Sequence, residues 1–117
     1  SSKKLRDLLY KIAGETDWLQ IVALYAELKR INPSPIVALN HAAAVAMCEG
    51  CEQGLRLIEA AGASGELDRY YFFHAARADL LRRLGRTQEA QSAYSRALQL
   101  TANQVDQKYI RRRLAEL

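Results

Sequence analysis

Two cysteines and two histidines are the side chains best suited to metal or redox chemistry. Cys48 and Cys51 form a Cys-x-x-Cys motif, which could supply half of a zinc site or a redox-active thiol pair. Zinc needs four ligands, and His41 lies two helical turns before Cys48, about 10 Å along a helix axis. Redox thiols favour a helix N-terminus, whereas Cys48 falls near a predicted C-terminus. We therefore expect no metal and no cofactor, and interpret both cysteines as incidental thiols beside a turn.

No catalytic constellation accompanies these residues. His74 follows an aromatic run with no serine or cysteine nucleophile beside it, so we expect a hydrogen-bonded packing residue. Glu66 and Asp68 lie in or beside a loop and are expected to be solvated. A glycine-rich phosphate loop and a His-Glu-x-x-His motif are both absent from the sequence. These features predict that the chain is not an enzyme.

A repeat spacing indicates which elements position the remaining residues. The stretch from Leu84 to Ala90, followed by Tyr94, Ala97 and Leu100, is typical of a tetratricopeptide repeat, whose period is about 34 residues. Small residues let paired helices approach closely, and a glycine tolerates the left-handed turn between them. One period before Gly85 the chain has Gly50 next to Cys51, which indicates the same turn in an earlier unit.

The predicted fold class is all-α: one domain forming a right-handed, tetratricopeptide-repeat-like superhelix of three helix pairs with a C-terminal capping helix. The pairs cover about residues 2–34, 35–66 and 67–101, and the capping helix covers about 103–117. The expected helices lie at about 3–13, 17–31, 36–48, 52–61, 67–84, 87–100 and 103–117.

The repeat pattern also predicts the positions of particular side chains and helix ends. Tyr25 and Tyr94 share one phase of the repeat, so both are expected in equivalent buried wedges. The fourth helix should be short, because Gly54 arrives one residue early for the small position. Thr101 and Gln104 are expected to form a capping box before the last helix.

Composition narrows the possible environments and partners. The 117 residues are half apolar and carry a net charge of +4, too modest to indicate a nucleic-acid binder. There is no apolar run of the roughly 20 residues that a bilayer requires, and the first residues do not look like a signal peptide. We therefore expect a cytoplasmic domain that does not contact a membrane.

Since no catalytic site is predicted, we expect the domain to act by binding another protein segment. First helices of stacked repeats line a shared concave groove, and the polar residues at that phase are expected to bind a protein segment or another domain of the same protein. Those residues are Asn40, His41, Arg77, Asp79, Arg82 and Arg83. The alternative is that Asn40 and Arg77 bond neighbouring backbone while Asp79 pairs with an arginine one turn away. As surface residues, five of them should tolerate alanine with little change in stability: Asn40, His41, Asp79, Arg82 and Arg83.

The last helix offers a second contact surface. Lys108 and three consecutive arginines, Arg111, Arg112 and Arg113, concentrate positive charge there. They would give solvated faces or salt-sensitive phosphate contacts, and we expect no direct sequence-specific DNA binding.

Particular strings resemble one known family more specifically than the repeat does. They include Thr16-Asp17-Trp18, Pro-Ser-Pro-Ile-Val-Ala-Leu-Asn at 33–40, Ala-Ala-Val-Ala-Met at 43–47 and His-Ala-Ala-Arg-Ala-Asp-Leu-Leu-Arg-Arg-Leu-Gly-Arg at 74–86. Over about residues 16–117 the chain resembles the C-terminal extension of a group of bacterial extracytoplasmic-function (ECF) RNA polymerase sigma factors.

The resemblance implies a regulatory role in transcription initiation. Two further domains, absent from this chain, would bind promoter DNA and the RNA polymerase core. The present domain would modulate the sigma factor through intramolecular or polymerase contacts. A generic peptide-binding repeat scaffold without a transcriptional role remains the alternative.

Overall fold

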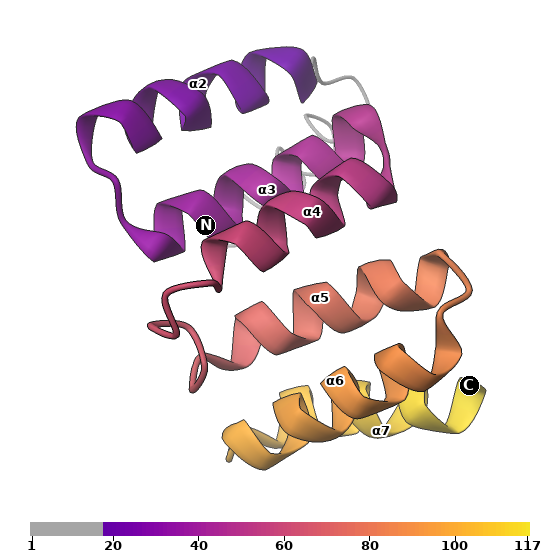
Figure 1. Cartoon of the computed structure of the whole chain (residues 1–117). Helices are drawn as coiled ribbons and strands as arrows, with labels where there is room; N and C mark the ends of the chain where they lie inside the picture. The colour runs from indigo at the N-terminus through magenta and orange to yellow at the C-terminus, as the bar shows by residue number, and fades with distance from the viewer. Residues whose placement is uncertain (1–17) are drawn as a thin grey trace, which may run out of the picture.

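The computed structural model describes residues 18–117, and within them every regular element is a helix. Figure 1 shows the helices as a stack of roughly antiparallel rods. The helices are α2 (Trp18–Ile31), α3 (Pro35–Glu49), α4 (Cys51–Ala61), α5 (Tyr71–Arg83), α6 (Thr87–Leu100) and α7 (Gln104–Glu116). The all-α prediction is confirmed for this range. The helix expected at about 3–13 lies outside the described residues.

Helix ends follow from local sequence chemistry. Ser34 caps α3 by accepting the Ile36 backbone N–H at 3.2 Å, and Pro35 occupies the first helical position, where no N–H is needed. Gly50 and Gly85 have φ of 104° and 77°, which confirms the two glycine turns expected between paired helices.

The capping box expected at Thr101 and Gln104 is wrong. Asn103 caps α7 instead, and its side-chain oxygen accepts the backbone N–H groups of Val105 at 2.8 Å and Asp106 at 3.2 Å. An asparagine directly before the helix reaches these groups better than a threonine two residues earlier. The Thr101 hydroxyl donates to the Asp106 carboxylate at 3.2 Å.

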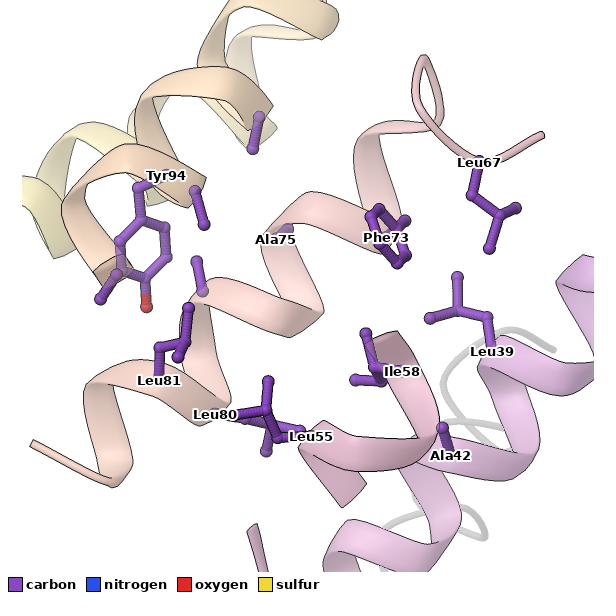
Figure 2. Packing of buried hydrophobic residues seen from close by; sticks show 14 of the residues in the cluster. Leu39, Ala42, Leu55, Ile58, Leu67, Phe73, Ala75, Leu80, Leu81 and Tyr94 are labelled. Carbon is purple, nitrogen blue, oxygen red and sulfur yellow. The ribbon is translucent and has the colours of Figure 1, made fainter. Parts of the chain in front are cut away.

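Helix α5 begins at Tyr71, later than the predicted Leu67. Residues 62–70 form successive turns closed by backbone bonds, including Asp68 N–H to Gly65 O at 3.2 Å and Tyr70 N–H to Leu67 O at 2.9 Å. Leu67 is nevertheless buried, and Figure 2 shows it beside Phe73. Residues 67–70 therefore form a turn instead of the first turn of the helix, and this turn places the Leu67 side chain in the core.

Close backbone approach fixes the pair α3 and α4. A Cβ on Gly54 would lie 2.4 Å from the Cβ of Ala46, so only glycine permits this distance. At 11 residues α4 is the shortest of the described helices, as expected. Helices α5 and α6 form a second extensively packed pair, α4 packs on α5, and α7 packs on α6.

One apolar cluster runs through α3 to α7 (Figure 2). Tyr94 is fully buried in it, whereas Tyr25 is only half-buried, so the two tyrosines do not have equivalent burial. The physical reason is position: α2 lies at the edge of the described stack, packs on α3 and contributes no buried residue. None of the helices within residues 18–117 is long and apolar enough to cross a membrane.

Candidate functional site

An open groove of about 430 Å³ lies between α3, α5 and α7, and we call it the α3–α5–α7 groove. Its floor consists of small and aliphatic residues: Ala43, Ala46, Ile58, Ala75, Ala76 and Leu80. Its rim carries larger side chains: Met47, Tyr71, Phe72, Asp79, Arg83, Asp106 and Tyr109. Met47 and Phe72 are 54% and 39% exposed, so two large apolar groups border the groove in contact with solvent.

A second hollow, of about 360 Å³, adjoins the first. It lies between α2 and α3 and is lined by Trp18, Ile21, Tyr25, Asn40, Ala43, Ala44 and Met47. The two hollows share Ala43 and Met47. Together they form one surface that extends from α2 to α7.

A hydrogen-bond network closes the α7 end of the groove. The Asp79 carboxylate on α5 accepts the hydroxyl of Tyr94 at 2.5 Å and that of Tyr109 at 2.9 and 3.0 Å. Arg82 Nε donates to the Tyr94 oxygen at 3.0 Å, and its Nη2 lies 4.0 Å from Asp79. Three helices are thus joined through one carboxylate.

Burial raises the pKa of two tyrosines in this region, Tyr94 and Tyr71. It raises the pKa of Tyr94, and the hydrogen bond to Asp79 acts in the same direction. Burial also raises the pKa of Tyr71 to about 12, with the nearby charges of Asp106 and Asp79 adding to the effect. The charged form of both phenols is therefore disfavoured in the folded chain.

The arginine at the end of the network is held by two partners. Arg113 Nε donates to the Tyr109 oxygen at 3.4 Å, and its guanidinium lies 5.3 Å from the centre of the Tyr109 ring. Its Nη1 also pairs with Glu116 at 2.9 Å. These bonds, Tyr109 first and then Glu116, raise the pKa of Arg113.

The predicted groove residues are only partly brought together. Asp79 and Arg83 line the α3–α5–α7 groove, and Asn40 lines the adjoining hollow. His41, Arg77 and Arg82 line neither. Consecutive helical residues point about 100° apart, so Asn40 and His41 cannot share one narrow surface.

Asp79 and Arg82 make hydrogen bonds within the fold that the sequence did not indicate. Asp79 and Arg82 are hydrogen-bonded to Tyr94, so we now expect alanine at either position to lower the stability rather than leave it nearly unchanged. The anticipated pairing of Asp79 with Arg82 is present at 4.0 Å, but the tyrosine bonds are shorter.

His41 lies away from both hollows, half-buried on α3. Its Nδ1 atom is buried and has no hydrogen-bond partner among the described residues. Burial lowers the pKa of His41, and the positive charge of Lys29 lowers it further. The ring is therefore held in its neutral form on the side of α3 that faces away from the groove.

The basic surface predicted on α7 divides into two parts. Lys108, Arg111 and Arg112 are exposed, whereas Arg113 is half-buried against Tyr109. Arg112 also pairs with Glu116 at 3.7 Å. The exposed cationic surface is thus smaller than the sequence indicated.

The chemistry-bearing residues of the sequence lie apart from the groove. Cys48 and Cys51 are half-buried free thiols, and residues 18–117 contain no group of three or more His, Cys, Asp or Glu arranged to hold a metal. His74 Nε2 lies 2.9 Å from the Asp68 carbonyl oxygen and its ring packs edge-on against Phe73. The prediction of a hydrogen-bonded packing histidine is confirmed.

Sequence reasoning missed several residues of the groove. Met47, Tyr71, Asp106 and Tyr109 line it and were not among the predicted groove residues. A usable signal exists: Asp79, Tyr94 and Tyr109 are spaced 15 residues apart, which places one polar group on each of three successive helices.

Comparisons with known proteins add one relative. The chain is 43% identical over 103 residues to an uncharacterized protein of Rhizobium meliloti (strain 1021). The match covers 88% of this chain and 24% of that protein, so the chain spans about a quarter of the length of this relative. No family model matches the chain. No solved structure matches it either.

Proposed function

We propose that this chain is a protein-interaction domain that regulates transcription initiation within an ECF RNA polymerase sigma factor. The α3–α5–α7 groove is the binding surface. The observation that supports this surface most strongly is the exposure of Met47 and Phe72 beside an alanine-rich floor, because clustered exposed apolar groups mark protein-binding sites. The transcriptional role rests on the resemblance over about residues 16–117.

The proposed architecture is a tetratricopeptide-repeat-like right-handed superhelix. Pairing of α3 with α4 and of α5 with α6 supports it, as does the contact of α3 with α5, the first helices of the two pairs. Helix α2 is the second helix of the first pair, and α7 is the capping helix. Ile110 is fully buried on α7, and Tyr109 and Leu114 pack against the apolar cluster, which supports a helix that covers the end of a stack. Val105 at the start of α7 is 76% exposed and does not contribute to the cover.

The partners divide between this domain and the rest of the protein. RNA polymerase core and promoter DNA are bound by two sigma domains outside this chain, in the cytoplasm. The present domain binds a protein segment, either within the same polypeptide or on the polymerase. It has no catalytic role, and the exposed Lys108, Arg111 and Arg112 give at most sequence-independent contact with DNA.

A reporter assay with the intact protein tests the transcriptional role. A promoter that the protein recognises drives the reporter, and the whole protein is compared with a form lacking residues 18–117 at equal cellular level. The proposal expects a change in output of several-fold. Equal output would favour the alternative, a peptide-binding scaffold without a transcriptional role.

A further inference from the structure

We infer that the hollow between α2 and α3, here called the α2–α3 hollow, is a docking site for residues 3–13 of the same chain. These residues bind there as an amphipathic helix, with their apolar side chains in the hollow and their charged side chains in solvent. Because the hollow shares Ala43 and Met47 with the α3–α5–α7 groove, the docked helix closes the binding surface at its α2 end. The groove alone is then left for a partner protein.

The lining of the α2–α3 hollow favours an apolar, helical occupant. Among residues 18–117, its volume of about 360 Å³ is lined only by uncharged side chains. Ala43 and Ala44 of α3 are small enough to permit close approach of another helix. An extended segment in this position would place backbone N–H and C=O groups against mostly apolar atoms, whereas a helix satisfies these groups internally.

Helix α2 also has an apolar face that α3 leaves in contact with solvent. Leu24, Leu28 and Ile31 are 65%, 42% and 67% exposed, and α2 contributes no buried residue to the described core. At 100° per residue these three side chains lie within about 60° of one another around α2. Ile21, which lines the hollow, is next to them. A helix in the hollow therefore removes part of this face from water.

Residues 3–13 have the sequence pattern that such a surface requires. Leu5, Leu8, Leu9 and Ile12 recur at helical spacing and would form one apolar stripe. The charged residues of the segment fall outside the stripe: Lys3, Lys4, Arg6, Asp7 and Lys11. Docking of the stripe therefore leaves every charge hydrated.

The position of Trp18 places this segment beside the hollow. Trp18 is the first residue of α2 and lines the hollow, so only residues 14–17 separate the segment from its site. A connection of this length is typical of antiparallel helix pairs. So short a tether gives an effective concentration on the order of millimolar, which favours the segment over a second copy or a partner protein at micromolar concentration.

Hydrogen exchange at the amides of residues 3–13 measures the docking in the full 117-residue chain. Leu9→Ser removes one side chain of the stripe, so it should lower the docking equilibrium constant and speed this exchange at least about tenfold. Tyr10→Ser makes a similar change about 150° from the centre of the stripe and should leave the exchange unchanged.

The only tryptophan of the chain gives a second signal, because Trp18 lines the hollow. Leu8→Ser together with Leu9→Ser should shift its fluorescence emission to longer wavelength and increase quenching by acrylamide. Tyr10→Ser should change neither signal.

Variants on α2 locate the docking site. Ile21 lines the hollow, whereas Leu19 is 68% exposed and lies about 160° away around α2. Ile21→Ser should speed the exchange of residues 3–13, and Leu19→Ser should not. Unchanged exchange at the amides of α5 and α6 confirms that each variant is folded.

Free exchange of residues 3–13 in the unmodified chain would overturn the docking, as would equal effects of Leu9→Ser and Tyr10→Ser. Protection that grows with protein concentration, together with a dimer in sedimentation, would also overturn it and assign the hollow to a second copy. These measurements involve no partner protein, so their failure leaves the proposed binding role of the groove unaffected.

Discussion

The Asp79 carboxylate on α5 accepts the Tyr94 hydroxyl on α6 at 2.5 Å, although the Tyr94 side chain otherwise belongs to the fully buried core. The same carboxylate binds Tyr109 on α7 and lines the groove. One residue thus joins α5 to α6 and α7 by hydrogen bonds and also lines the groove. Because a substitution at Asp79 should alter the stability of the fold, the free energy of unfolding must be measured before any effect of the substitution on binding is interpreted.

Removing either partner of this bond should destabilise the fold. Asp79→Ala leaves two tyrosine hydroxyls without their acceptor and should lower the free energy of unfolding by about 1–3 kcal/mol. Tyr94→Phe should also destabilise, and the double variant should lose less than the sum because both changes remove one shared bond. Urea denaturation measures all three, with the exposed Glu59→Ala as control. Strict additivity would contradict the network.

Overpacking between α5 and α6 should be costly. Ala97 is fully buried on α6, so Ala97→Leu adds three carbons where no space is available and should cost about 1–3 kcal/mol. Ala115→Leu makes the same change at an exposed position of α7 and should be nearly neutral. Equal denaturation midpoints for the two variants would show that Ala97 is not a close-contact position.

Alkaline pH should destabilise the protein partly through Tyr71. Its pKa of about 12 in the folded state exceeds the ordinary value of about 10, so the folded state favours the neutral phenol. Its contribution is complete below pH about 10 and is lost as pH rises through about 12. Urea denaturation between these values should show a smaller loss for Tyr71→Phe than for the unmodified chain. An equal loss of unfolding free energy with pH in Tyr71→Phe and in the unmodified chain would rule out this contribution.

The sequence predicted those elements whose cause is local. Gly50 and Gly85 mark turns because their backbone needs positive φ, and Pro35 marks a helix start. The start of α5 was misplaced because Leu67 is buried from a turn, which no local pattern distinguishes from a helix.

The candidate site was less predictable for a related reason. Which face a residue takes depends on packing between helices, so Asn40 lines a hollow while its neighbour His41 does not. The bond of Asp79 to Tyr109 joins residues 30 positions apart, and their 15-residue spacing with Tyr94 places the three polar groups on successive helices without showing that they meet. The exposure of apolar rim residues such as Phe72 depends on how the helices pack against one another, and helical phase alone does not determine it.

The two thiols should be dispensable for the fold. Cys48 and Cys51 are half-buried beside Gly50 and do not line the groove, although Cys51 packs against the apolar cluster, so Ser at both positions should keep the fold and lower the unfolding midpoint only modestly. Circular dichroism checks the fold, and native mass spectrometry of the unmodified chain checks for metal. One zinc ion per chain would contradict this interpretation.

The central claim is that the α3–α5–α7 groove regulates transcription. It is tested most directly by reporter output from the intact protein carrying Phe72→Ala together with Arg83→Glu, compared with the matched pair Val105→Ala and Arg56→Glu. The groove pair is expected to shift output in the direction of the domain deletion, while the matched pair is expected to behave as the unmodified protein. A deletion that alters output while both pairs leave it unchanged would contradict the claim and direct attention to the exposed face of α7.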